Sequence, residues 1–244
     1  MRYDAFKRFT KHFDKRGPLV PRFPLTRTLG PLGVTANGAA RWYLAGGISA
    51  SACVAAYQPK GAASLAASYI NLANPGTYDA APGVAPTWAS STGWTFNGTS
   101  QYLTTGIVPS TGWSAIIRFD SLVATGSFQY LLGMDDAAGK GFHIAADTTL
   151  SANSWRNPSA INYSRSAGAG VLAMNATTAF VDGSAVPGSF SGTVPSVAVF
   201  VGARNRQVEG VGAYTKGNIV GAAIYNVSLS AAQIGAVTAA MQAL

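Results

Sequence analysis

The stretch GNIVGAAIYNVSLSAAQIGAV, residues 217–237, decides the fold class of this chain. Its first ten residues are mostly apolar or small and predict a β-strand over 217–226. Ser230 follows closely, and Gln233 stands three positions after it, which is the spacing of a helical capping box. Apolar residues then recur at helical intervals, at Ile234, Val237, Met241 and Leu244. The sequence therefore predicts a strand followed by one short helix that closes the chain.

Short β-like runs separated by turn signals fill the part of the chain that precedes this stretch. The predicted runs are 113–122, 128–136, 141–147, 161–166, 170–175 and 196–205. Two dipeptides, Asn97-Gly98 and Asp182-Gly183, stand between aromatic or apolar runs and predict β-hairpins. Regular turns with almost no helix predict an all-β, two-sheet antiparallel sandwich over residues 47–244.

Residues 1–46 differ in character and predict a basic arm outside the sandwich. The first 41 residues carry a net charge of +7, whereas the whole chain carries +8. Residues 1–16 predict a short amphipathic helix, which Gly17-Pro18 ends, and the prolines that follow favour extended backbone. The candidate docking residues of this helix are Arg2, Tyr3, Phe6, Lys7, Arg8, Phe9, Lys11 and Phe13.

The aromatic stripe of the predicted arm helix requires a surface to cover it. A helix of about 16 residues is marginal in water and cannot bury four aromatic side chains by itself. We therefore expect the stripe to dock on another protein or on a copy of this chain, through an acidic or apolar surface. The alternative is that the arm folds back onto its own sandwich.

The composition shows a low fraction of charged residues and argues against a disulfide, a cysteine-based zinc site and a membrane span. Charged residues make up only 11% of the chain, against about 25% in a typical domain. A single cysteine, Cys53, allows neither an intramolecular disulfide nor a cysteine-based zinc site. The apolar run 42–57 is shorter than the roughly 20 residues that cross a bilayer, so no membrane span is expected.

Three segments suggest a family when they are taken in chain order. They are WTFNGTSQYLTTG (94–106), GVLAMNATTAFVDGSAV (170–186) and VFVGARN (199–205) with the 217–237 stretch. Together they resemble the concanavalin A-like and laminin-G-like jelly rolls. Residues 55–83 resemble variants of this module in tailed-phage structural proteins. The family includes lectins, glycan-binding modules, glycosidases and structural domains, so the resemblance implies a fold rather than one function.

The acidic and histidine residues do not form a recognisable catalytic set. Glycoside hydrolysis needs two carboxylates across one cleft, and Glu209 is the only glutamate. Asp135 and Asp136 are adjacent and are expected in a turn or at a solvated edge. His12 lies in the arm, and His143 lies in a predicted strand as an exposed or hydrogen-bonded structural residue. The sequence therefore predicts a protein that is not an enzyme.

Two patches are candidates for glycan binding, because aromatic faces and polar side chains together suit sugar rings and hydroxyls. The candidate residues are Trp155, Arg156, Asn157 and Tyr163 in one patch, and Arg204, Asn205, Arg206 and Tyr214 in the other. The alternative for each patch is aromatic packing over a sheet edge. No cofactor is expected, but an oxygen-ligand calcium site stays open, with Asp135, Asp136 and Asp147 as its candidates.

These observations leave three functions. The preferred hypothesis is a non-enzymatic structural protein of a virus particle, docked by its arm and able to contact host surface glycans. The first alternative is a free carbohydrate-binding module of a secreted or cell-surface protein. The second is a nucleic-acid-binding protein that uses the basic arm, although the aromatic stripe and the prolines favour a protein surface over phosphates.

Overall fold

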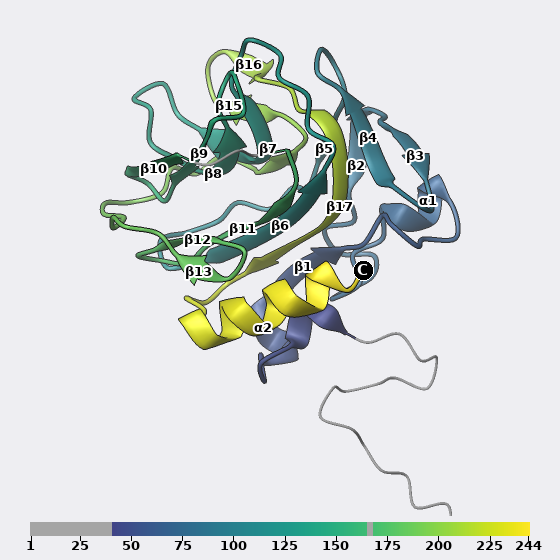
Figure 1. Cartoon of the computed structure of the whole chain (residues 1–244), viewed down its shortest axis with the longest axis horizontal. Coiled ribbons are helices and arrows are strands. Elements are labelled where there is room, and N and C mark those ends of the chain that lie inside the picture. The colour runs from purple at the N-terminus through teal and green to yellow at the C-terminus, as the bar shows by residue number, and fades with distance from the viewer. Residues whose placement is uncertain (1–40, 165–167) are drawn as a thin grey trace, which may run out of the picture.

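The computed structural model describes residues 41–164 and 168–244, and two stacked β-sheets form most of this part (Figure 1). Its strand pairs are antiparallel, apart from a short parallel contact between β15 (Arg204–Arg206) and β7 (Gln129–Asp135). The two-sheet antiparallel sandwich predicted from the sequence is therefore confirmed. The predicted arm helix over 1–16, with its docking residues, lies outside the described residues.

The first sheet is built around the strand predicted from the 217–226 stretch. Its spatial order is β13 (Ser184–Ala185), β12 (Ala179–Val181), β11 (Gly170–Met174), β6 (Ser114–Asp120), β17 (Lys216–Tyr225), β4 (Gly93–Asn97) and β3 (Thr87–Ala89). β17 pairs with β6 along one edge. Along its other edge it pairs first with β4 and then with β1 (Cys53–Tyr57).

The second sheet faces the first and carries a hairpin beside β7. Its spatial order is β10 (Ala160–Ser164), β9 (Ala152–Arg156), β8 (Gly141–Ala146), β7, β14 (Phe200–Val201), β5 (Tyr102–Thr104) and β2 (Ala81–Val84). β15 and β16 (Gly210–Gly212) form the hairpin, which adjoins the end of β7. The connections hold three short helical segments, η1 (Trp42–Leu44), η2 (Ala50–Ala52) and α1 (Leu65–Ser68).

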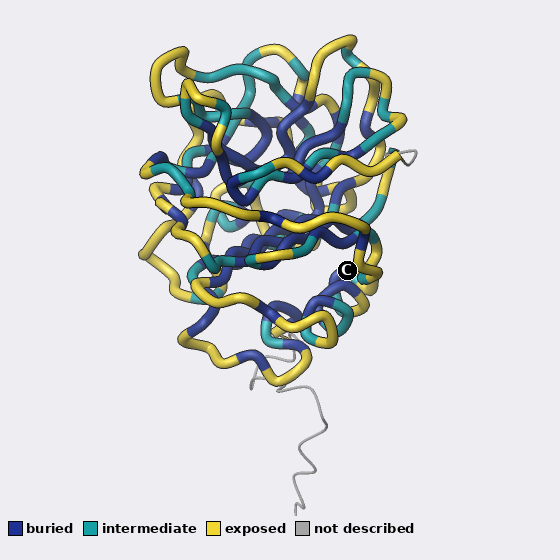
Figure 2. The backbone as a smooth tube through the Cα atoms, turned by 90° about the vertical axis from the view of Figure 1, so that its left-hand side faces the viewer, coloured by how far each residue is buried: buried dark blue, intermediate teal, exposed yellow. Residues whose placement is uncertain are grey.

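The main core lies between the two sheets, where alternate residues of facing strands meet. Figure 2 shows the buried segments gathered inside the molecule and the exposed ones at its periphery. Large side chains from both sheets, including Trp94, Phe119, Phe142 and Trp155, are exposed by 1% or less. Each such side chain stabilises the fold by roughly 1.5–3 kcal/mol through removal of apolar surface from water.

The helix α2 (Ala231–Gln242) covers the outer face of the first sheet (Figure 1). Its apolar residues pack on outward-facing side chains of that sheet, such as Ile116 and Phe180, and form a second core cluster. The predicted capping box is present, because the Ser230 hydroxyl accepts from the Gln233 N–H and the Gln233 side chain accepts from the Ser230 N–H. The predicted closing helix is therefore confirmed.

The folded unit begins earlier than the predicted boundary at residue 47. Trp42 and Tyr43 in η1 are 2% and 6% exposed and belong to the same core cluster as α2. The Tyr225 hydroxyl donates to the Tyr43 carbonyl at 2.9 Å. The sequence predicted these residues as part of the arm because they directly follow a basic segment, with no turn signal between them.

The two predicted hairpins have different outcomes. Asp182-Gly183 joins β12 to β13 with positive φ at both residues, as predicted. Asn97-Gly98 does not form a hairpin, since β4 and β5 belong to different sheets. The Asn97 side chain instead accepts from the N–H groups of Thr99 and Ser100, and the chain crosses here from the first sheet to the second.

The strand predicted over 196–205 is shorter and is broken into β14 and β15. Gly202, at φ +81°, separates them, and a Cβ at this position would lie 2.3 Å from the Phe96 ring. The chain reverses there, so that β14 runs antiparallel to β7 and β15 runs parallel to it. The reversal brings two arginines of β15 to the end of the second sheet.

Candidate functional site

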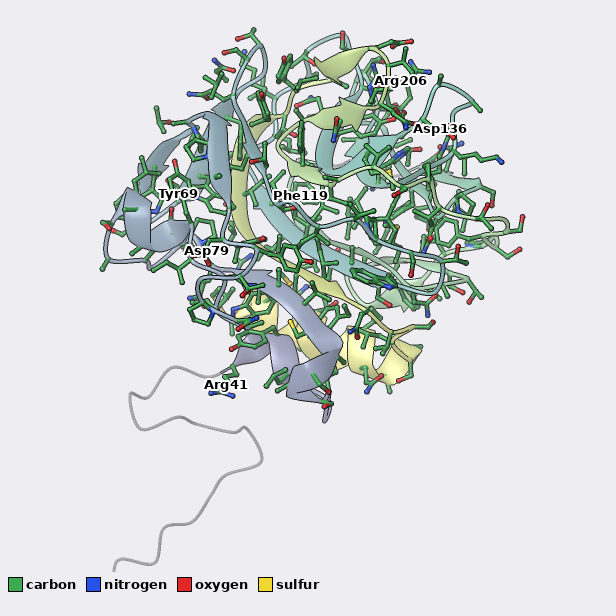
Figure 3. The ribbon with its side chains drawn as sticks, turned by 180° about the vertical axis from the view of Figure 1, so that it is seen from behind. Arg41, Tyr69, Asp79, Phe119, Asp136 and Arg206 are labelled. Carbon is green, nitrogen blue, oxygen red and sulfur yellow. The ribbon has the colours of Figure 1, made fainter. Side chains whose placement is uncertain are left out.

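Three arginines gather at the end of the second sheet, and we call Arg156, Arg204 and Arg206 the arginine cluster. Arg204 and Arg206 come from β15, and Arg206 lies opposite Asp135 of β7 in register. Arg156 ends β9 and lies opposite His143 of β8. Figure 3 shows Arg206 near Asp136, at the end of the molecule away from α2. Residues from two separately predicted patches thus meet in one place.

A buried carboxylate lies beneath the cluster. Asp135 is 4% exposed, and its Oδ1 lies 3.6 Å from Arg206 Nε and 3.9 Å from Arg204 Nε. Tyr130 donates its hydroxyl to Asp135 Oδ2 at 3.2 Å. Burial raises the pKa of Asp135, and the positive charge of Arg204 offsets part of that effect. The expectation of a turn or solvated edge is therefore wrong for Asp135.

The neighbouring Asp136 does occupy a turn. Its carboxylate accepts from the Lys140 N–H at 2.8 Å, within the connection from β7 to β8. Arg206 Nε also donates to the Asp136 carbonyl at 3.3 Å. Adjacent acids at a strand end thus have opposite environments, because successive residues face opposite ways.

An exposed carboxylate bridges two arginines from the outside. Glu209 Oε2 lies 2.6 Å from Arg206 Nη1 and 3.5 Å from Arg204 Nη2, and its side chain is 56% exposed. Glu209 sits in the connection between β15 and β16. The only sequence signal for this contact is the single glutamate of the chain, three positions after Arg206, and Glu209 was not among the predicted binding residues. The outer guanidinium nitrogens therefore already hold one carboxylate at the surface.

His143 completes the base of the cluster as a neutral, buried ring. It is 2% exposed, and its ring centroid lies 4.4 Å from that of Tyr130. Burial lowers the pKa of His143 to about 3, and the charges of Arg156 and Arg204 add to that effect. The prediction of an exposed or hydrogen-bonded His143 is wrong, because the ring is buried and its Nδ1 has no hydrogen-bond partner.

Other polar atoms of the cluster are buried without a hydrogen-bond partner. Among the described residues these include the Nε atoms of Arg156 and Arg204 and the Oδ1 of Asp135. Buried polar atoms in folded proteins are nearly always satisfied by protein, water or a ligand. These donors and acceptors are concentrated where the three arginines meet.

An aromatic group adjoins the cluster on the same sheet, and we call Tyr102, Phe200 and Tyr214 the aromatic trio. The Tyr102 ring stacks on Phe200 with centroids 5.1 Å apart, and it lies 6.5 Å from the Tyr214 ring. All three side chains are half-buried. Phe200 is opposite Gly133 in register, and Gly133 is opposite His143, so the trio and the cluster are neighbours across β7.

Several predicted glycan-binding residues have other roles. Trp155 is fully buried in the main core, so the prediction that it contacts a sugar is wrong. Tyr163 is opposite Asn153 in register and, by strand alternation, faces away from the side that carries Arg156. The amides of Asn157 and Asn205 are committed to backbone carbonyls, at Asn175 and Ala198 respectively.

The candidate calcium ligands do not come together. In the described part of the chain, no group of three or more His, Cys, Asp or Glu side chains could hold a metal ion. Asp147 accepts from Thr149 and Ser151 within its own turn, and these bonds lower its pKa.

Cys53 is buried, and burial raises the pKa of its thiol to about 12.

No family model and no curated protein matches the chain. Among solved structures, a mutant of Trypanosoma rangeli sialidase with trans-sialidase activity has a TM-score of 0.54 and 14% identity, over 82% of this chain and 34% of the sialidase. The CBM40 of Ruminococcus gnavus IT-sialidase, bound to α2,3 sialyllactose, has a TM-score of 0.43 and 18% identity, over 53% of this chain and 84% of its own. The chain thus spans about a third of the length of the sialidases it matches. The sialidase match shows that the two chains share a β-sandwich fold.

Proposed function

We propose that this chain is a non-catalytic carbohydrate-binding module whose arginine cluster receives a sugar that carries a carboxylate. The observation that carries the proposal is the position of Glu209, an exposed carboxylate that bridges Arg204 and Arg206. A ligand carboxylate with the same charge and shape replaces Glu209 at the outer guanidinium nitrogens. Arginine is suited to this contact, because its planar fork matches a carboxylate with two parallel hydrogen bonds.

The rest of the sugar contacts the aromatic trio. Half-buried rings offer the apolar face that a sugar ring needs, and Phe200 lies beside Gly133, whose other register neighbour is His143. The arginine cluster has three positive charges, and its two neighbouring carboxylates, Asp135 and Glu209, have two negative charges. One positive charge is therefore left for an acidic ligand.

The chemistry of the described side chains supports binding without catalysis. Asp135 is buried under two arginines, which keeps it from serving as one of two opposed carboxylates across a cleft. His143 is buried and has a pKa of about 3, so it does not exchange protons near neutral pH. Cys53 stays a neutral thiol because its pKa is about 12.

The test is a calorimetric titration of 3′-sialyllactose, which carries a carboxylate, beside lactose, which does not. The wild-type chain should bind the acidic sugar more tightly than lactose. Arg204→Lys keeps the positive charge but removes the planar guanidinium group that binds a carboxylate through two hydrogen bonds. This variant should bind the acidic sugar about tenfold more weakly. Arg41→Ala is the matched control, because Arg41 is exposed and lies at the opposite end of the molecule (Figure 3).

Glu209→Gln gives a change in the opposite direction. This variant keeps the shape of the side chain and removes the competing carboxylate, so binding of 3′-sialyllactose should tighten by about two- to fivefold. Equal affinity for the two sugars, or weaker binding by Glu209→Gln, would contradict the proposal.

Docking of the module on a larger assembly through the basic arm rests on the sequence. Its residues lie outside the described part, so a virus particle, or a cell surface in the alternative, is proposed here from charge and periodicity only. Removal of residues 1–40 tests it, because the shortened chain should lose incorporation into particles or oligomers while it keeps sugar binding. Retained incorporation would exclude the arm as the docking element.

A further inference from the structure

A hollow lies beside β1, away from the arginine cluster. Its volume is about 460 Å³, within the range of pockets that hold small ligands. The 71–80 loop, η2, β1 and the residue after β17 form its walls. Its side chains are uncharged, and those that carry the argument are Ser51, Asn74, Tyr78, Trp113 and Asn226. We call this hollow the β1 cleft.

The loop that forms one wall is fixed in place by a buried amide. Asn71 is fully buried, and its Oδ1 accepts from the N–H groups of Ala56 and Ala73, at 3.0 Å each. Its Nδ2 donates to the carbonyls of Val54 and Thr77. The Asn71 amide thus occupies the free edge of β1 where a neighbouring strand would lie, and it anchors the loop to the sheet.

The acidic residue of the loop adds two further contacts. Asp79 accepts from the N–H groups of Asn71 and Gly76. The Thr77 N–H also donates to the Asn74 carbonyl at 3.0 Å. The backbone of the loop is therefore held before any ligand arrives, which lowers the entropic cost of binding.

Tyr78 is held in a conformation that a residue with a side chain rarely adopts. Its φ is +58°, in the left-handed region, and its side chain is among the exposed large apolar groups at 44%. The buried Tyr57 donates its hydroxyl to the Tyr78 carbonyl at 2.6 Å and fixes this backbone. A glycine would avoid the strain, so tyrosine at this position has a cost in stability.

Trp113 and Asn226 form the facing wall, and their backbones are also fixed. The Trp113 carbonyl accepts from the Asn157 amide at 3.3 Å. The Asn226 N–H donates to the Ala52 carbonyl at 3.0 Å. The side chains are held as well, since the Asn226 amide donates to the Ser51 carbonyl at 3.4 Å and Trp113 packs against the main core.

We propose that the β1 cleft is a second binding site, for a neutral monosaccharide or disaccharide. The aromatic rings of Tyr78 and Trp113 offer apolar faces to a sugar ring. The Asn74 amide, the Asn226 Oδ1 and the Ser51 hydroxyl, which shares one hydrogen bond with Ser49, offer donors and acceptors to its hydroxyl groups. A cleft lined by uncharged side chains gives no compensation for a ligand charge, so the ligand is uncharged.

This site is independent of the arginine cluster. It uses the end of β1 and the residue after β17, both in the first sheet, whereas the cluster belongs to the second sheet. Figure 3 shows Asp79, in the loop that carries Tyr78, well away from Arg206. Loss of acidic-sugar binding in Arg204→Lys should therefore leave neutral-sugar binding unchanged, and each proposal can fail alone.

The decisive variant is Tyr78→Gly, followed by saturation-transfer NMR and titration with methyl glycosides of glucose, galactose, mannose and N-acetylglucosamine. The wild-type chain should bind at least one of these sugars. Tyr78→Gly removes the ring and relieves the strained φ, so affinity should fall by more than about tenfold while the thermal unfolding midpoint is no lower. A residue with a purely structural role would not give this combination.

Two further variants complete the test. Tyr78→Phe keeps the ring and should keep most of the affinity. Tyr163→Ala is the matched control, since Tyr163 is similarly exposed, at 39%, but lies on β10 in the second sheet. The proposal is overturned if the wild-type chain binds none of the four sugars, or if Tyr78→Gly binds as tightly as the wild-type chain.

Discussion

At the scale of single residues, the buried neutral His143 makes stability depend on pH. Its pKa is about 3 in the folded chain, against about 6.5 in an unfolded chain. Between these values the unfolded chain binds a proton that the folded chain does not. Stability should therefore fall as pH drops below about 6.5, by about 1.4 kcal/mol per pH unit, until the folded His143 also protonates near pH 3.

The measurement is urea unfolding of the wild-type chain and of His143→Gln at several pH values between 7 and 4. The raised pKa of Asp135 acts in the opposite sense, but it is present in both proteins and largely cancels in the difference. The stability advantage of the wild-type chain over the variant should shrink as pH falls. Parallel pH profiles would show that His143 has the same pKa in the folded and unfolded chains.

Asp136 occupies a turn, as predicted, because that turn is made by neighbouring residues. Arg156 and Arg204 were predicted in two separate patches, and they meet because β9 and β15 bring them to the same end of the sheet, which no local pattern contains. Trp155 was misplaced because period-2 alternation separates the two faces of a strand but does not say which face is inside. The surroundings of Trp155 are polar in sequence, and its burial follows from the opposing sheet.

At the scale of elements, α2 depends on its first turn. Ser230→Ala removes the side-chain acceptor of the capping box and should lower the free energy of unfolding by about 1 kcal/mol. Chemical denaturation of this variant measures the loss. Ser196→Ala, at an exposed loop position, should show almost none. A Ser230→Ala variant as stable as the wild-type chain would mean that tertiary packing alone holds the helix.

Elements specified by neighbouring residues could be predicted, and those specified by distant ones could not. The capping box and the Asp182-Gly183 turn each involve a few adjacent residues. Asn97-Gly98 has an equally good local signal, but β4 pairs with β17, about 120 residues away, rather than with β5. Such pairing depends on the whole sheet, and no window around the turn contains it.

The β1 cleft could not have been predicted from the sequence for the same reason. Its walls come from segments near residues 51, 74, 113 and 226, each of which is unremarkable alone. The buried Asn71 that orders the loop reads as an ordinary turn residue.

At the scale of the whole molecule, the position where the folded unit begins can be tested by truncation. A chain without residues 1–40 keeps Trp42 and Tyr43, which are buried against the same cluster as α2, and should melt like the full chain. A chain without residues 1–46 loses both rings and should be destabilised by at least about 3 kcal/mol. Equal melting of the two truncated chains would place the boundary where the sequence suggested.

The covering of one sheet face by α2 also fixes the direction from which the module can be attached. Residue 41 enters η1 beside α2, and α2 ends at the C-terminus on that same flank (Figure 1). A neighbouring domain joined after residue 244 therefore departs from the helical flank. The arginine cluster lies at the opposite end of the molecule (Figure 3), so a partner fused to the C-terminus would leave the cluster accessible.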